Sequence, residues 1–185
     1  ATEQQNTKAQ PAFSLDSLIT ACLADISADS IEHYMRELEG FGNRFMLNPN
    51  RRMIAGFLTD KFISFGFTEV AIDSFLWENS YTPGNPVWQY NVVATLNGTV
   101  NAGVEYLVGG HYDNIIVGNQ PFDSTWVIPG ADDNASGIAA TLEIARVLAA
   151  KNIQPGSTLK FVCFASEEEG HGGSRYFSES ARQSN

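Results

Sequence analysis

The stretch LKFVCFASEEEG at residues 159–170 decides the fold class. Its first part, 159–165, is almost continuously apolar, which is typical of a strand buried at the centre of a sheet. Three glutamates, Glu167, Glu168 and Glu169, follow soon after it. Carboxylates held this close repel one another, so the folded chain needs positive charge beside them, and a bound cation is the simplest source. A solvated acidic turn is the alternative that this stretch alone leaves open.

Helices and strands alternate on the N-terminal side of this stretch. Hydrophobic spacing predicts helices over 15–26, 51–65 and 134–151, and a further helix that is capped by Ser27 or Asp29 and ends at Gly40. Alternating or β-branched runs predict strands over 69–76, 90–96 and 105–110. Asn97-Gly98 is typical of a tight turn between two strands. Residues 77–87 and 114–130 are expected to be loops, and a last helix begins at Gly173. The order predicts an α/β fold, a three-layer α/β/α sandwich around a mixed, mostly parallel central sheet.

A histidine follows the strand predicted at 105–110. In GGHYD, residues 109–113, His111 leaves the strand after two glycines, which allow the backbone to turn freely. Asp113 is close enough in sequence to accept the second ring N–H of a metal-bound His111 and so fix its tautomer. Open α/β sheets bind ligands at the carboxyl ends of their strands, where both residues are expected. A loop histidine without a ligand is the alternative.

Two adjacent aspartates open the helix predicted at 134–151. They belong to the segment PGADDNASG at 129–137, in which small residues flank Asp132 and Asp133 and leave space for an ion and a ligand. The alternative is an ordinary helix start, because Asp and Asn cap helix N-termini and complement the helix dipole. One capping residue would suffice for that purpose, so the second aspartate favours a binding role.

The three segments together predict a metal centre. One imidazole and several carboxylates suit zinc or a similar divalent ion, and the surplus of carboxylates points to two ions bridged by one of them. Calcium fits less well, because the acids do not alternate within one loop. The sequence contains no GxSxG, no HExxH, no phosphate-binding GxxxxGK[ST] and no GxGxxG after a strand. Metal-assisted chemistry is therefore favoured over these alternatives.

The order and spacing of these motifs resemble those of the co-catalytic di-zinc aminopeptidases of the secreted bacterial leucyl-aminopeptidase type. Relatives of that family include glutamate carboxypeptidase and glutaminyl cyclase. The matching segments are GGHYD at 109–113, PGADDNASG at 129–137, SEEEG at 166–170 and GGSRYF at 172–177. The resemblance, strong over about residues 90–177, implies a zinc-exopeptidase-like sheet whose C-terminal part is missing here. Residues 1–12 are expected to be a flexible leader, and 13–185 the N-terminal portion of a single zinc-peptidase domain.

The resemblance implies a role for each matched residue. His111 would bind one zinc ion, Asp132 would bridge two ions, and Glu168 would bind the ion that His111 does not. Glu167 would be the general base, which takes a proton from the attacking water and passes it to the leaving amine. Asp113 would be the carboxylate that orients His111. The implied reaction is hydrolysis of the N-terminal peptide bond of peptide substrates by a metal-dependent exopeptidase with a bridged di-zinc site.

Other features of such enzymes also bear on this chain. The peptide bond between the matched aspartates, here Asp132 and Asp133, is often cis. Two further zinc ligands, an aspartate and a histidine, lie downstream of the paired glutamates, and the expected position of the aspartate is past Asn185. His171 aligns with a position that is normally not a ligand. We therefore expect weak metal binding and little activity from a 1–185 polypeptide. The alternatives are a carboxypeptidase, a glutaminyl cyclase-like enzyme or a non-catalytic binding module.

Composition bears on partners and compartment. The 185 residues carry a net charge of −10, with a pI near 4.6, which argues against nucleic acid and anionic membrane surfaces as partners. No apolar run is long enough to span a bilayer, whereas a lipid anchor and the oligomeric state stay open. Cys22 and Cys163 are expected to be buried free thiols rather than a disulfide. The polar leader suits a secreted, periplasmic or cell-surface protein whose signal has been removed.

Overall fold

The computed structural model describes residues 15–115 and 122–184, so the predicted leader at 1–12 lies outside the described residues. The predicted helices and strands are all present, with ends that differ by a few residues. In chain order they are α1 (Leu15–Ala24), α2 (Ala28–Glu39), α3 (Arg51–Ser64), β1 (Glu69–Trp77), β2 (Val87–Leu96), β3 (Asn101–His111), α4 (Ser136–Ala150), β4 (Ser157–Phe164) and α5 (Gly172–Ser184). A kinked segment, Ala131–Ala135, whose backbone is non-helical at Asp133 and Asn134, leads directly into α4.

The four described strands form one mixed sheet in the order β1-β2-β4-β3. The β3 and β4 strands are parallel and are connected through α4, as a crossover between parallel strands requires. The β1–β2 and β2–β4 pairs are antiparallel. The predicted mixed sheet is confirmed, but most pairings in this part of the chain are antiparallel rather than parallel. The loop at 78–86 is too short for a crossover and can join only antiparallel neighbours.

The connection at Asn97-Gly98 is not the expected hairpin turn, because β4 lies between β2 and β3. The backbone N–H of Gly98 donates to the Thr158 hydroxyl at 3.0 Å. A Cβ atom at Gly98 would lie only 2.6 Å from the carbonyl carbon of Ser157. Glycine therefore allows the chain to cross the first residues of β4, which takes the central place that its apolar sequence favours.

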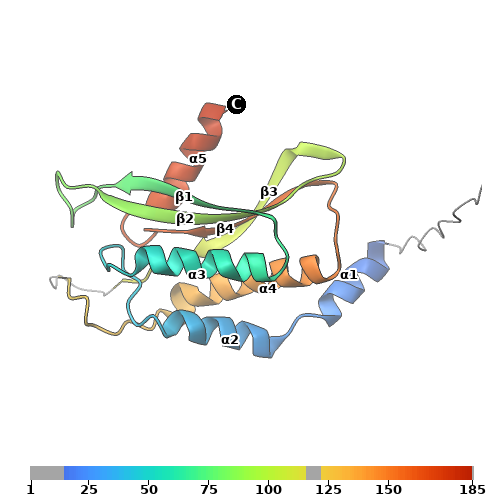
Figure 1. The fold of residues 1–185 in the computed structure, drawn as a ribbon, viewed down its shortest axis with the longest axis horizontal. Coiled ribbons are helices and arrows are strands. Elements are labelled where there is room, and N and C mark those ends of the chain that lie inside the picture. Colours follow the sequence, from blue (N-terminus) through green and yellow to red (C-terminus); the bar gives the residue numbers. More distant parts are fainter. Residues whose placement is uncertain (1–14, 116–121, 185) are drawn as a thin grey trace, which may run out of the picture.

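Helices cover both faces of the sheet, which confirms the three-layer prediction. Figure 1 shows α2, α3 and α4 on one face and α5 on the other. The core lies between the sheet and α2, α3 and α4, whose buried apolar residues face β2 and β4. Its fully buried members include Leu38, Ile54, Leu58, Phe62, Val92, Ile138, Leu142 and Phe161. This packing holds α4 firmly against the strands that carry the predicted site.

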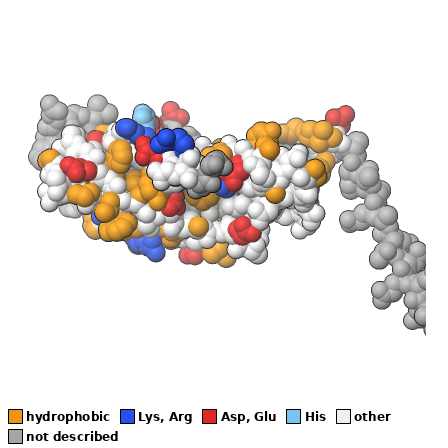
Figure 2. Space-filling view, turned by 90° about the horizontal axis from the view of Figure 1, so that it is seen from above, with side chains coloured by type: hydrophobic (Ala, Val, Ile, Leu, Met, Phe, Trp, Pro, Cys, Tyr) orange, Lys and Arg blue, Asp and Glu red, His pale blue; other side chains and the backbone are white. Residues whose placement is uncertain are grey.

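The first helix packs less closely than the others. It has no buried residue, and Leu15, Ile19 and Leu23 are exposed on it. Figure 2 shows these apolar side chains gathered at one end of the molecule. Both cysteines are free, and Cys163 is buried as predicted, but Cys22 is partly exposed because α1 packs loosely. None of the helices in the described residues combines the length and the apolarity that crossing a bilayer requires.

Candidate metal centre

The carboxyl ends of β3 and β4 lie side by side, because these strands are parallel neighbours. His111, the last residue of β3, pairs with Phe164, the last residue of β4. The acidic segment at 167–169 therefore begins next to His111. The segment that precedes α4, at 131–135, contacts β3. The three motif segments thus meet where the strand order predicts a ligand site in an α/β sheet.

Gly109 and Gly110 serve close packing rather than the free turn expected from the sequence. Both lie within β3, which continues to His111. A Cβ atom at Gly109 would overlap the carbonyl oxygen of Val162, and one at Gly110 would lie 3.3 Å from the backbone of Gly137. The two glycines therefore let β4 and the first turn of α4 approach β3 closely. This approach brings the other two motif segments to His111.

Three side chains converge at this edge, those of His111, Asp133 and Glu168. Each offers one ligand atom, and these atoms all lie within 4.8 Å of one another. The Nε2 atom of His111 is 2.9 Å from Oδ1 of Asp133, with His111 9% exposed and Asp133 75% exposed. One imidazole nitrogen and two carboxylate oxygens form a donor set that zinc binds well. The arrangement therefore fits a zinc ion, with further coordination positions left for water or other ligands.

The structure groups Asp133, and not Asp132, with His111 and Glu168. Asp133 has extended backbone angles, φ −113° and ψ 98°. Successive side chains of an extended chain point in opposite directions, so two adjacent aspartates cannot both face His111. Asp132, the residue expected to bridge the ions, is exposed and lies outside the group. The cis peptide bond is also one residue later than expected, between Asp133 and Asn134.

Asp113 is buried beside this group, with 1% of its surface exposed. Its two carboxylate oxygens accept the backbone N–H groups of Glu167, at 3.0 Å, and Glu168, at 3.2 Å. The Nδ1 atom of His111 faces the Asp113 carbonyl oxygen at 3.2 Å and its carboxylate at 3.6 Å. The expected contact with His111 is present, although the nearer acceptor is the backbone carbonyl. The carboxylate mainly fixes the start of the glutamate segment.

Glu167 lies next to the three ligand atoms and remains reachable from solvent. Its Oε2 atom is 3.6 Å from Nε2 of His111, and 32% of its side chain is exposed. Its Oε1 atom is 2.8 Å from Nδ1 of His171, a side chain that is 67% exposed. His171 does not belong to the three-residue group, in line with its expected non-ligand position. Its contact with Glu167 was not predicted, because sequence spacing alone does not show where a loop histidine points.

Carboxylates outnumber cationic groups in the cluster around His111. Burial raises the pKa of Glu168 to about 7, and the negative charges of Asp133 and Asp113 add to this effect. Burial alone would lower the pKa of His111, but the hydrogen bond and charge of Asp113, with the charges of Glu167 and Glu168, raise it to about 9. Within 15–115 and 122–184, the ion pairs of Asp133 and Glu167 involve histidines only. Several carboxylates around one imidazole favour a bound cation.

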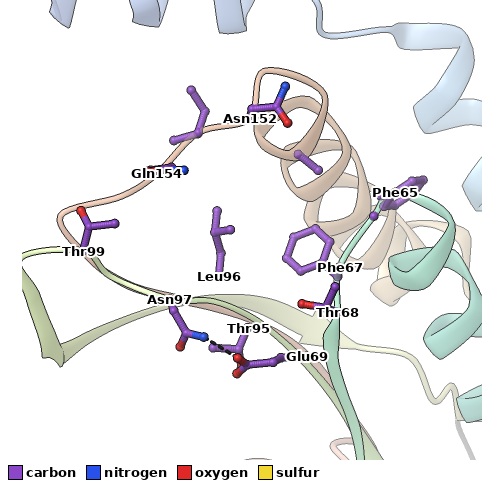
Figure 3. Close-up of a pocket in the computed structure, with 13 residues that line it drawn as sticks. Phe65, Phe67, Thr68, Glu69, Thr95, Leu96, Asn97, Thr99, Asn152 and Gln154 are labelled. Carbon is purple, nitrogen blue, oxygen red and sulfur yellow. Dashed lines mark hydrogen bonds between the residues drawn. The ribbon is translucent and has the colours of Figure 1, made fainter. Parts of the chain in front are cut away.

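A hollow elsewhere on the molecule does not have this chemistry. It has a volume of about 470 Å³ and is lined by residues from the ends of α3 and α4 and from β1 and β2. Figure 3 shows Phe65, Phe67 and Asn152 around it. Its lining contains no histidine or cysteine and one acid, Glu69, which accepts a hydrogen bond from Asn97. The cluster around His111 is therefore the better candidate for catalysis.

Curated relatives that carry the name "Probable zinc metalloprotease" are similar to most of the chain. One from Pyrenophora tritici-repentis is 38% identical over 164 residues, which cover 80% of this chain and 36% of that protein. Another from Pyricularia oryzae is 30% identical over 178 residues, which cover 90% of this chain and 35% of that protein. The chain thus spans about a third of the length of the curated relatives it matches.

Solved structures share the fold. LapB from Legionella pneumophila has a TM-score of 0.71 at 22% identity, over 92% of this chain and 43% of that one. A Zn-dependent exopeptidase from Parabacteroides distasonis has a TM-score of 0.65 at 25% identity, over 79% and 49%. A glutaminyl cyclase from Porphyromonas gingivalis has a TM-score of 0.63 at 26% identity, over 79% and 50%. These likenesses confirm the predicted zinc-exopeptidase-like α/β fold.

The family model that matches the chain covers residues 91–185, a range that contains all three motif segments. It describes peptidase family M28. The match agrees with the resemblance drawn from the motifs and extends over about half of the chain. The chain therefore belongs to peptidase family M28.

Proposed function

We propose that this chain carries the metal-binding and proton-transfer residues of a zinc-dependent aminopeptidase. The observation that supports this most directly is the convergence of His111, Asp133 and Glu168 within 4.8 Å, next to Glu167. Bound zinc would supply a Lewis acid that polarises the scissile carbonyl and lowers the pKa of water. The name zinc metalloprotease of the curated relatives supports the choice of metal.

Two ions form part of the proposal, with Asp133 in the bridging role that the sequence had suggested for Asp132. The Asp133 side chain is 75% exposed, so its carboxylate can face a second ion as well as the one beside His111. The ligand atom of Glu168 lies within 4.8 Å of those of both other residues. A site for two ions needs more donors than these three side chains provide. We propose that the remaining donors are the downstream aspartate and histidine expected from the family resemblance.

Glu167 is proposed as the residue that moves the proton. Its carboxylate would accept a proton from the attacking water and deliver it to the leaving amine. Two contacts support this role, because they keep the side chain beside the ligand atoms. The Oε1 atom faces His171 at 2.8 Å, and the backbone N–H is fixed by the buried Asp113 carboxylate at 3.0 Å.

The surroundings of the cluster favour an amine end of the substrate over a carboxylate end. A carboxypeptidase needs a cationic group to bind the terminal carboxylate of its substrate. Asp133, Glu167 and Glu168 give this edge an excess of carboxylates, and the ion pairs recorded for Asp133 and Glu167 are with histidines. An acidic site attracts a protonated N-terminus instead. Cyclisation of an N-terminal glutamine is the second candidate reaction, because a glutaminyl cyclase is among the similar structures.

The test uses the full-length protein loaded with zinc. We expect it to hydrolyse an aminoacyl p-nitroanilide, and to leave both the α-N-acetylated analogue and a peptide that is blocked at its N-terminus intact. Formation of pyroglutamate from an N-terminal glutamine peptide without hydrolysis would support the cyclase instead. Cleavage of the blocked peptide from its C-terminus would support a carboxypeptidase.

A single substitution then tests the proton-transfer role. Glu167→Gln should keep the zinc content and lower kcat by a factor of about 10² or more, as expected for loss of a positioned base. Glu169→Gln is the matched control, because Glu169 is an acid of the same segment that lies outside the ligand group. It should keep kcat within a few-fold of wild type. A Glu167→Gln variant as fast as the control would contradict the role.

A further inference from the structure

We infer that Arg44 is a positioning residue for the metal centre, acting through the two backbone segments that carry His111 and Asp133. This inference rests on the proposed function. Arg44 lies in the connector between α2 and α3, and it is the largest fully buried side chain in the described part of the structure, with 0% of its surface exposed. A buried guanidinium is costly unless its donors are paired. Its partners therefore indicate what the residue does.

The partners of the Arg44 guanidinium are main-chain carbonyl groups from three separate segments. Tyr112 directly follows His111, and Gly130 precedes Asp133 by three positions. The planar fork of an arginine can bind several acceptors in fixed directions at once. The accepting oxygens are those of Tyr112 (2.7 Å from Nε), Leu38 (3.0 Å from Nη1), Pro129 (2.9 Å from Nη1) and Gly130 (2.9 Å from Nη2). One rigid group thus links the His111 segment to the Asp133 segment.

Further contacts beside Arg44 strengthen the connection between the His111 segment and the Asp133 segment. The backbone N–H of Arg44 donates to Oδ1 of the buried Asn114 at 2.9 Å, and Nδ2 of Asn114 donates to the Ile128 carbonyl at 2.7 Å. Gly130 has a positive φ of 51°, and a Cβ atom there would lie 2.8 Å from both Nη2 of Arg44 and Cβ of Asn114. The loop before Asp133 therefore packs directly on the arginine.

The acceptors of the Arg44 guanidinium indicate that it positions backbone segments and does not neutralise the charge of a carboxylate. All the side-chain hydrogen bonds recorded for Arg44 end on carbonyl oxygens and none on a carboxylate. Burial lowers the pKa of Arg44 to about 10, an effect that the charge of Asp113 opposes, so the group stays protonated at neutral pH. A lysine would keep the positive charge but present a single ammonium group. It could not hold the Tyr112 and Gly130 carbonyls in the same fixed relation.

The test measures zinc affinity in the full-length Arg44→Lys variant by competition with a chromophoric chelator. Circular dichroism first establishes a temperature at which the variant and the wild type are both fully folded. We expect zinc affinity to fall by about 10-fold or more, the usual effect of losing a group that orients metal ligands. Zinc affinity within two-fold of wild type would overturn the inference.

Arg146→Lys is the matched control for a general loss of stability. Arg146 also donates several hydrogen bonds, to Glu143 at 2.7 and 2.8 Å and to the Asp25 carbonyl at 2.7 Å. None of these partners belongs to the metal centre. This variant should melt at a lower temperature than the wild type and keep its zinc affinity. An equal loss of zinc affinity in both variants would overturn the inference, because it would show an effect of stability alone.

A second variant covers the case in which Arg44→Lys does not fold. Gly130→Ala keeps every donor of Arg44 but places a methyl group 2.8 Å from its Nη2 atom and 2.9 Å from the Asp133 carbonyl oxygen, so it disturbs the same link from the Asp133 side. It should also weaken zinc binding by about 10-fold, and wild-type affinity in this folded variant would overturn the inference. Absence of zinc binding in the wild type would overturn the proposed function itself. Zinc binding in the wild type with unchanged affinity in the variants overturns the positioning role alone.

Discussion

His111 and Glu168 bind protons more tightly in the folded chain than in an unfolded one. The pKa of Glu168 rises from 4.5 to about 7, chiefly through burial, and that of His111 rises from 6.5 to about 9, where nearby carboxylates outweigh burial. A group whose pKa is raised on folding contributes its full stabilisation at pH values below its pKa in the unfolded chain. This contribution is lost as the pH rises through its pKa in the folded chain. The metal-free protein should therefore become less stable as the pH rises from about 4.5 to about 9, because the Glu168 contribution is lost between about pH 4.5 and 7 and the His111 contribution between about pH 6.5 and 9.

Calorimetry of the chelator-treated protein checks this expectation. The melting temperature should fall by several degrees across that window, since a shift of more than one pKa unit in a buried group is a large change for a chain of this size. Added zinc should remove most of the decline, because the ion takes the place of the protons. A melting temperature of the metal-free protein that rises with pH would contradict the charge arrangement around His111.

Isosteric substitutions distinguish the roles of Asp132 and Asp133 in zinc binding. Asp133→Asn should weaken zinc binding by more than about 10-fold, because it removes a carboxylate that faces His111. Asp132→Asn is the adjacent control and should stay within two-fold of wild type, because Asp132 lies outside the ligand group. Titration of both variants with zinc checks the pair. A larger loss of zinc affinity in Asp132→Asn than in Asp133→Asn would instead assign the bridging role to Asp132.

The sequence pointed to this pair of aspartates and the family resemblance to Asp132, whereas the structure groups Asp133 with His111 and Glu168. The small residues around the pair indicated space for an ion, which is a local property of the sequence. The direction of each carboxylate depends on the extended backbone at Asp133, which does not follow from residue types. Arg44 was not predicted at all, because its carbonyl partners lie on segments far apart in the sequence.

At the scale of single elements, the approach of β4 to β3 depends on Gly109. Gly109→Ala should destabilise the protein by about 1–3 kcal/mol or more, because the added methyl group meets the Val162 carbonyl and pushes the strands apart. Gly103→Ala, in the same strand, is the control, since nothing lies within 4 Å of a Cβ atom there. Urea denaturation measures both variants. Equal stability of the two would show that β3 and β4 tolerate a wider separation.

Helices were easier to predict than strand partners. The 3.6-residue periodicity placed α2, α3 and α4 correctly to within a few residues, since it depends only on local sequence. The β3 strand starts at Asn101 rather than at residue 105, because its exposed first residues carry no apolar alternation. The hairpin expected at Asn97-Gly98 was wrong for a different reason. Strands that follow one another in sequence are often neighbours in the sheet, which favours pairing of β2 with β3. Here β4, more than fifty residues downstream of Gly98, lies between them.

At the scale of the whole molecule, the fold brings together residues from β3, the start of α4 and the segment after β4. The α2, α3 and α4 layer buries its apolar faces on the sheet and leaves the carboxyl ends of β3 and β4 free for chemistry. The family and the fold were predictable because the three motifs keep their order and spacing. The two ions and the downstream aspartate and histidine stay predictions, because the described residues bring together three ligand side chains, fewer than two ions need.

Anomalous diffraction at the zinc edge, from crystals of the full-length protein grown with zinc, would show which side chains bind the ion. We expect zinc to lie about 2.0–2.2 Å from a carboxylate oxygen of Asp133 and at a similar distance from Nε2 of His111 or an oxygen of Glu168. Glu167 should lie close by without binding the ion. Zinc bound by Asp132, or no zinc beside His111, would contradict the account.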